Sequence, residues 1–85
     1  MLEAIKLKRT GVSKGYPDVF VPLVTPIYPG FFVEMKRVKG GVVSPEQAEW
    51  IEYLKGQGYY AAVAKGADEA KRMFEEFIAT MPIAA

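Results

Sequence analysis

Residues 31–38 read FFVEMKRV, and this stretch decides how the chain folds and where its chemistry lies. Aromatic and β-branched residues dominate it, which predicts a β-strand. Successive side chains of a strand point to opposite faces, so Glu34 and Lys36, two residues apart, point the same way. This pair indicates either a functional site or an ordinary ion pair on the wet face of a two-stranded ribbon, because charged pairs are common on strands.

A further acidic residue stands at the start of the preceding apolar run. GYPD, residues 15–18, predicts a turn, and DVFVPLV, residues 18–24, predicts a strand. Pro22 cannot donate to a ladder, which favours an edge position or a bulge. If this run pairs beside FFVEMKRV, Asp18 approaches Glu34, and the two carboxylates offer hard oxygen ligands for Mg²⁺.

A helix and a third strand follow. Ser44 is a predicted N-cap with Pro45 at the first helical position, which predicts a helix as far as about Gln57. The run YYAAVA, residues 59–64, predicts a buried strand with small residues. The passage from strand through helix to strand predicts a right-handed parallel crossover.

Two more helices complete the prediction, over residues 2–9 and from about Ala67 onward. The sequence therefore predicts an α/β fold of the α+β kind, a small mixed β-sheet flanked by helices in the order α-β-β-α-β-α, as one domain over residues 1–85. The last helix carries an apolar stripe for a core or an interface, formed by Ala70, Met73, Phe74, Phe77, Ile78 and Met81.

Composition narrows the function classes. The chain has 85 residues, 51% of them hydrophobic, and a domain this small gains core by pairing with a second copy, which predicts a homodimer. Cysteine and histidine are both absent. This excludes disulfide frameworks, thiolate zinc sites and catalytic triads that use histidine, and it leaves carboxylates, lysine, tyrosine and glutamine for any chemistry.

Charge is distributed unevenly along the chain. Residues 1–39 hold seven Lys/Arg against three Asp/Glu, a net +4, whereas residues 40–85 hold four against seven, a net −3. The basic half surrounds the candidate site, where a polyanion would dock through phosphate contacts. An ordinary mixed surface explains the same charges equally well.

No signal segment opens the chain and no apolar run has the length of a membrane span, so the sequence predicts a soluble, cytoplasmic protein without a membrane partner. Gly40 and Gly41 lack the pattern of a nucleotide-binding loop, so no nucleotide cofactor is expected.

The candidate residues suit phosphodiester cleavage. That reaction needs a nucleophilic water, stabilisation of phosphoryl charge and help for the leaving oxygen, all of which a divalent metal can supply. Asp18 and Glu34 are the expected ligands, and the backbone carbonyl of Met35 could complete the set, since Mg²⁺ keeps several waters. Lys36 could either orient the attacking water or neutralise developing charge.

Gln47 has two interpretations. It shares a helical face with Trp50, Ile51 and Leu54, so its amide could reach a metal-bound water or a phosphate oxygen. Alternatively it bonds back to the Ser44 backbone in a capping box.

Aromatic residues could stack on unpaired bases, but Trp50, Tyr59 and Tyr60 lie in apolar segments and are predicted core residues. Tyr16 is the exception, because it lies beside the Pro17-Asp18 turn and is expected to line a substrate cleft.

The ordered segments GYPDVFVP, FFVEMKRVKGG, SPEQAEW and GYYAAVA resemble the VRR-NUC domain, the virus-type replication-repair nuclease branch of the PD-(D/E)xK superfamily. The resemblance spans about residues 11–77. It implies a restriction-endonuclease-like core and a DNA endonuclease that uses Mg²⁺ or Mn²⁺. It further implies homodimers that cut branched DNA, such as four-way junctions, in bacteria or phage-infected cells.

The same resemblance implies roles for individual residues. Asp18 and Glu34 become metal ligands, Lys36 the catalytic lysine and Gln47 the additional motif residue. Residues around these are expected to contact DNA, namely Lys14, Tyr16, Arg37 and Lys39.

One departure from the family pattern concerns the N-terminus. Family members carry a helix with a further acidic residue, and then a strand, before the turn, whereas fourteen residues precede Gly15 here and Glu3 is their sole acid. Three explanations of the short N-terminus stay open: a natural minimal form of the domain, a misassigned start site or a truncated piece of a longer protein. A non-catalytic DNA-binding module and a structural dimerisation protein are the alternative functions.

Overall fold

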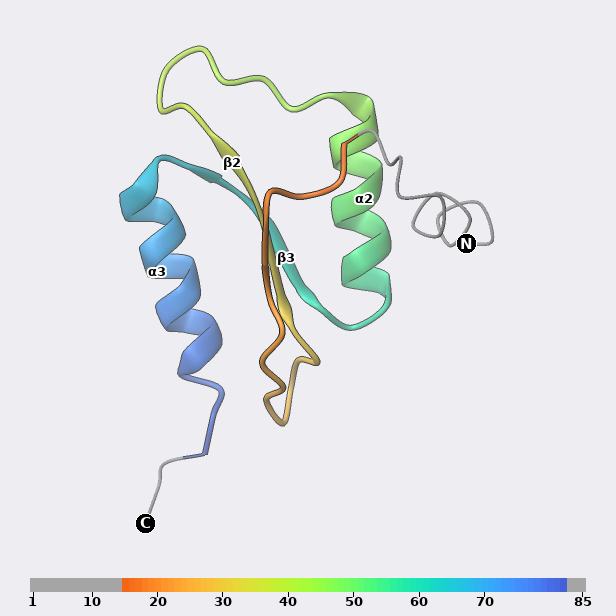
Figure 1. Ribbon diagram of the computed structural model, residues 1–85, viewed down its shortest axis with the longest axis vertical. Coiled ribbons are helices and arrows are strands. Elements are labelled where there is room, and N and C mark those ends of the chain that lie inside the picture. The colour runs from red at the N-terminus through yellow and green to blue at the C-terminus, as the bar shows by residue number, and fades with distance from the viewer. Residues whose placement is uncertain (1–14, 83–85) are drawn as a thin grey trace.

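The structure is a computed structural model that describes residues 15–82, and the helix predicted over residues 2–9 lies outside this range. The predicted order of strands and helices from the GYPD turn onward is confirmed (Figure 1). The elements are β1 (Val19–Val21), β2 (Phe31–Lys36), α2 (Pro45–Gly56), β3 (Tyr60–Lys65) and α3 (Ala67–Ile78).

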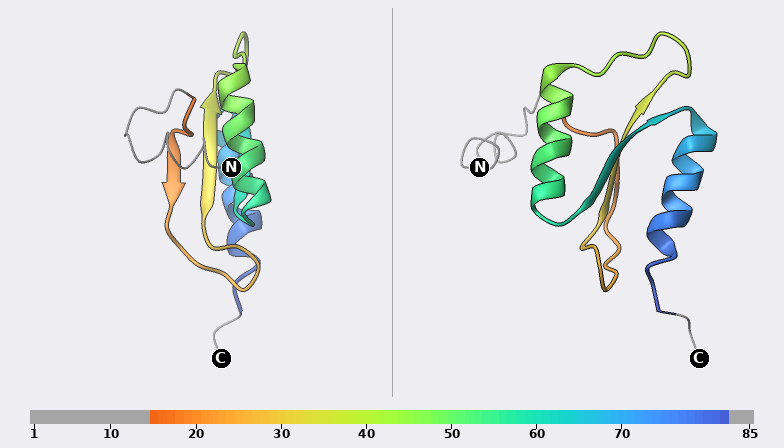
Figure 2. Two further views of the ribbon diagram at one scale, coloured as in Figure 1. Left: turned by 90° about the vertical axis from the view of Figure 1, so that its right-hand side faces the viewer. Right: turned by 180° about the vertical axis from the view of Figure 1, so that it is seen from behind.

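The three strands form one mixed sheet in the order β1-β2-β3. β1 runs antiparallel to β2, with Val19 opposite Val33, and β3 runs parallel to β2, with Phe32 opposite Ala61. The predicted pairing of the first two strands and the predicted parallel crossover are therefore both present. The two helices lie on opposite sides of the sheet, as the views in Figure 2 show.

Strand alternation divides the core into two layers. Phe32 and Ala61 project toward α2 and pack with Trp50, Ile51 and Leu54. The alternate residues of β2 and β3 point to the other side of the sheet and project toward α3, where Phe77 has no exposed surface. This second layer contains Phe31, Val33, Ala64 and Phe77. Because β2 is covered on both sides, its first four residues are all buried, Glu34 among them.

The first strand is shorter than the predicted run of residues 18–24. It ends at Val21, directly before Pro22, because proline has no N–H to continue the ladder. The strand lies at the edge of the sheet, as Pro22 predicted. The following loop turns at Thr25, whose hydroxyl accepts hydrogen bonds from the amides of Ile27 and Tyr28.

The apolar stripe predicted for the last helix packs against the sheet through part of its length. Phe77 is buried, while Phe74 keeps 37% of its surface exposed. No helix within residues 15–82 is long and apolar enough to cross a membrane.

Candidate active site

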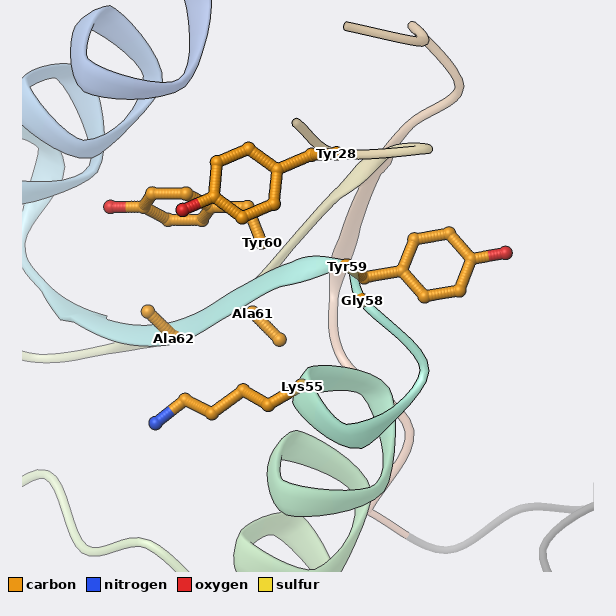
Figure 3. Close-up of a pocket in the computed structure, with 7 residues that line it drawn as sticks. All are labelled: Tyr28, Lys55, Gly58, Tyr59, Tyr60, Ala61 and Ala62. Atoms are coloured by element: carbon orange, nitrogen blue, oxygen red, sulfur yellow. The ribbon is translucent and has the colours of Figure 1, made fainter. Parts of the chain in front are cut away.

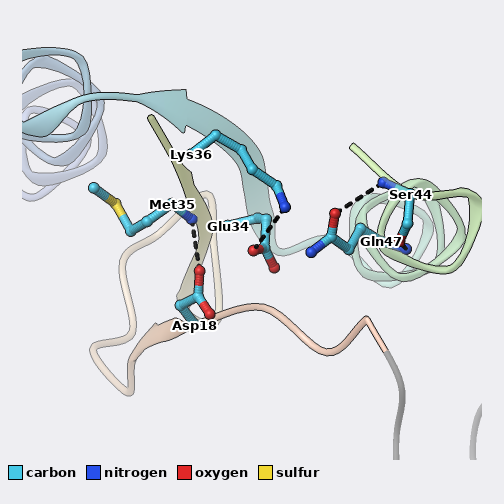
Figure 4. A network of polar contacts seen from close by, with 6 residues as sticks. All are labelled: Asp18, Glu34, Met35, Lys36, Ser44 and Gln47. Carbon is cyan, nitrogen blue, oxygen red and sulfur yellow. Dashed lines mark hydrogen bonds and ion pairs between the residues drawn. The ribbon is translucent and has the colours of Figure 1, made fainter. Parts of the chain in front are cut away.

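The site lies on the α2 side of β2, where the structure brings Asp18, Glu34, Lys36 and Gln47 toward one another (Figure 4). Glu34 and Lys36 share this side because they alternate with Met35 along the strand. Asp18 precedes β1, whose ladder begins with the pair Val19 and Val33, so its carboxylate stands beside the end of β2. The predicted approach of Asp18 to Glu34 is therefore present.

Close packing holds the GYPD turn against the start of α2. Gly15 adopts a φ of +85°, and a Cβ at this position would lie 2.7 Å from the backbone nitrogen of Gln47. Only glycine combines this backbone conformation with so close an approach. The turn therefore enters β1 beside α2, which sets where Asp18 lies.

Glu34 is the unusual residue of the site. Its exposed fraction is 3%, and its Oε1 is a buried atom without a hydrogen-bond partner among residues 15–82. The pKa of Glu34 is raised from 4.5 to about 7, first by burial and then by the neighbouring Asp18 carboxylate, while Lys36 acts in the opposite direction. A buried oxygen without a hydrogen bond lowers the stability of the folded state, so its presence in a native structure calls for an explanation such as a role in a functional site.

Lys36 lies on the same side and partly neutralises this carboxylate. Its Nζ is 3.7 Å from Oε2 of Glu34, and 17% of the lysine side chain is exposed. One oxygen of Glu34 thus lies near an ammonium, and the other accepts no hydrogen bond from residues 15–82. The wet-surface ion pair considered from sequence alone does not fit, because Glu34 is buried.

Asp18 bonds to the backbone of the neighbouring strand. Its Oδ2 accepts a hydrogen bond from the N–H of Met35 at 2.9 Å. The N–H and C=O of one strand residue point to the same side, so the Met35 carbonyl also points toward Asp18. The ladder with β1 begins at Val33, and no β1 residue stands opposite Met35. The two predicted carboxylates thus lie near each other, and the Met35 carbonyl points to the edge of β2 at which Asp18 lies.

Gln47 forms the capping box that the sequence left as an alternative. Its Oε1 accepts from the Ser44 N–H at 2.9 Å, and the Ser44 hydroxyl accepts from the Gln47 N–H at 3.2 Å. The cap occupies only the amide oxygen. The amide nitrogen is directed toward Glu34, as Figure 4 shows, so the capping role and a role in the site are compatible.

Three of the four predicted DNA-contacting residues lie within the described part of the chain, and all three are exposed. Tyr16 is 38% exposed and packs edge-on against Trp50 with ring centroids 4.9 Å apart. Burial, and then the neighbouring Tyr59, raise the pKa of Tyr16. Arg37 and Lys39 follow β2 and are exposed. Lys14 lies outside the described residues.

The donor set suits a hard divalent cation. Mg²⁺ is usually held by one or two carboxylates together with waters and substrate oxygens, rather than by a full protein cage. Asp18 and Glu34 supply that number, and the unpaired Oε1 of Glu34 supplies a free acceptor. Within residues 15–82, no three Asp, Glu, His or Cys side chains gather to hold a metal.

A separate pocket of about 470 Å³ lies at the opposite end of β3 (Figure 3). It is lined by Tyr28, Tyr60 and Lys55 and by the small side chains of Ala61 and Ala62 on β3. The Tyr60 hydroxyl donates to Glu76 at 3.0 Å, and burial is the main cause that raises the pKa of Tyr60 to about 12. None of the predicted site residues within the described range 15–82 lines this pocket.

Comparison with known proteins identifies relatives. The family model described as the VRR-NUC domain matches residues 2–68. A solved structure named a VRR_NUC domain protein superimposes with a TM-score of 0.81 and 36% sequence identity, over 96% of this chain and 67% of that chain. The chain matches none of the curated proteins compared with it.

Proposed function

Because this chain belongs to the VRR-NUC domain family, a family of nuclease-type domains, we propose that it is a metal-dependent endonuclease that hydrolyses DNA phosphodiester bonds. The observation that carries the proposal is the unpaired, buried Oε1 of Glu34 beside the Asp18 carboxylate. A buried carboxylate whose pKa is raised by burial and by a neighbouring carboxylate, as that of Glu34 is, is typical of a functional site and suits a ligand of a bound cation.

Asp18, Glu34 and the carbonyl of Met35 would hold Mg²⁺ or Mn²⁺ in this proposal. When bound, the metal supplies Lewis-acid stabilisation of phosphoryl charge and a more acidic water. Glu34 serves as a ligand in its ionised form, and its pKa of about 7 makes the loss of that proton part of metal binding.

Lys36 then acts on the phosphate. It lies 3.7 Å from Glu34 and keeps part of its surface exposed, so its ammonium can reach toward the substrate without leaving the site. From this position it either orients the attacking water or neutralises charge on the phosphoryl group. The Gln47 amide nitrogen, directed at the same place, is a further donor for a phosphate oxygen.

DNA is the proposed partner, held by phosphate contacts from Lys14, Arg37 and Lys39 and by Tyr16 along the cleft. Arg37 and Lys39 are exposed next to the strand that bears Glu34, which supports this assignment. Branched DNA such as a four-way junction is the proposed preferred substrate, and a homodimer the proposed active form, since a two-fold dimer presents two equal sites.

Nicking of a circular or branched DNA in the presence of Mn²⁺ tests the proposal. Asp18→Asn and Glu34→Gln should each abolish cleavage and weaken metal binding measured by calorimetry, because each removes a ligand charge and little volume. Glu49→Gln, an exposed change of the same kind on α2, is the matched control and should cut normally. Undiminished nicking by either site variant, free of contaminating nuclease, would refute the assignment.

A non-catalytic DNA-binding module is the second candidate function. The observation that favours it is that only two acidic side chains meet at the site within residues 15–82. The same assay separates the two, because this alternative requires DNA binding without nicking at any concentration of Mg²⁺ or Mn²⁺.

A further inference from the structure

A second lysine continues the site across the sheet. Lys65 is the last residue of β3 and stands in register with Lys36 on β2. Residues in register on neighbouring strands point to the same side, so Lys65 projects on the α2 side, as Lys36 and Glu34 do. Neighbouring strands lie about 4.8 Å apart, which places the two lysines side by side. Lys65 is exposed.

Two like charges in adjacent positions on one side of a sheet are unfavourable for folding. Lys36 contacts Glu34, but within residues 15–82 the Lys65 ammonium has no ion-pair partner. Glu69, four residues further along the chain, accepts a hydrogen bond from the backbone N–H of Lys65 at 2.9 Å and forms no ion pair with its ammonium. A polyanion that binds across both lysines would offset their repulsion.

The packing around the site leaves one direction for such a ligand. Toward the start of β2, the same side of the sheet is filled by Phe32, Trp50 and Leu54, which are buried under α2. A nucleic acid strand cannot run that way along β2. It can cross the strands near their ends, from Asp18 beside β1, over Glu34 and Lys36 on β2, to Lys65 on β3.

We infer that Lys65 binds a DNA phosphate next to the one that is cut, so that the substrate strand crosses the sheet from Asp18 to Lys65. This inference rests on the proposed nuclease function and adds a contact and a direction to it. One DNA strand carries a charge for each 3.4 Å or so of helix axis, so flexible lysines on adjacent β-strands can reach neighbouring phosphates. Lys65 is a positioning residue, and the chemistry stays with Lys36.

The test is the salt dependence of DNA binding by the full chain in the presence of a metal chelator, which separates binding from cleavage. Lys65→Ala should weaken binding and make the slope of log affinity against log salt shallower by about 1, the loss of one phosphate contact. Lys65→Arg keeps the charge and should keep the slope. Lys55→Ala is the control, since Lys55 is exposed at the other end of β3.

Cleavage provides the second measurement. Lys65→Ala should raise KM and leave kcat near the wild-type value, because a contact made equally in the ground state and the transition state affects binding alone. An unchanged salt slope, or a loss equal to that of Lys55→Ala, overturns the inference while wild-type cleavage upholds the proposed function. A wild-type chain that neither binds nor cuts DNA overturns both.

Discussion

Replacement of Glu34 by glutamine should change how the stability of this protein depends on pH. In the folded chain the pKa of Glu34 is about 7, compared with 4.5 for an ordinary glutamate. Between these values the folded state holds a proton that the unfolded state has released, so the free energy of unfolding falls as pH rises. The stabilisation is complete below about pH 4.5 and is lost as pH rises through about 7.

The magnitude follows from the size of the pKa difference. It spans about 2.5 pH units, and each unit corresponds to about 1.4 kcal/mol, so wild-type stability should fall by about 3.5 kcal/mol relative to Glu34→Gln over this range. Glutamine keeps the shape of the side chain and carries no titrating proton. Any constant difference from altered contacts with Lys36 leaves this comparison unchanged.

Urea unfolding at a series of pH values, followed by fluorescence, measures this difference. Trp50 is the only tryptophan of the chain and is 4% exposed, so its emission reports unfolding directly. The chain has no histidine and no cysteine, which leaves no other side chain with an ordinary pKa between about 5 and 8. Parallel stability curves for the two proteins between about pH 4 and pH 8 would refute the raised pKa of Glu34.

Three further substitutions test other parts of the site. Lys36→Ala should lower kcat by orders of magnitude with little loss of DNA affinity, whereas Lys39→Ala should mainly weaken DNA binding. Single-turnover kinetics separate the two effects, and a normal cleavage rate of DNA bound to Lys36→Ala would contradict the catalytic role of Lys36. Gln47→Ala should lose about 1 kcal/mol of stability with its cap, whereas Gln47→Glu should keep the cap, as urea unfolding would show. Both variants lack the amide nitrogen and should nick DNA slowly; nicking by both at the wild-type rate would leave Gln47 a capping residue only. Gly15→Ala should lower the free energy of unfolding, measured with urea, by at least about 1 kcal/mol, because φ at this position is +85° and the added Cβ would contact α2. A variant as stable as the wild type would contradict the close approach of the GYPD turn to α2.

Local patterns in the sequence were sufficient for the main elements. Ser44 and Gln47 begin a helix through hydrogen bonds to each other, with Pro45 at the first helical position, and these bonds are present in the structure. Alternation along FFVEMKRV placed Glu34 and Lys36 on one side, because the period of a strand is a property of its own backbone. The edge position of the strand before Pro22 followed from a missing N–H.

Tertiary structure decided what surrounds those residues. The burial of Glu34 and its unpaired Oε1 depend on the helix α2 that covers this side of β2 and on the strand β1 that pairs with it, and both elements lie outside FFVEMKRV. Lys36 and Lys65 are 29 positions apart in the chain, and they lie side by side because of the register of the two parallel strands. Register is set by packing between distant segments, so a pattern in either segment alone does not determine it.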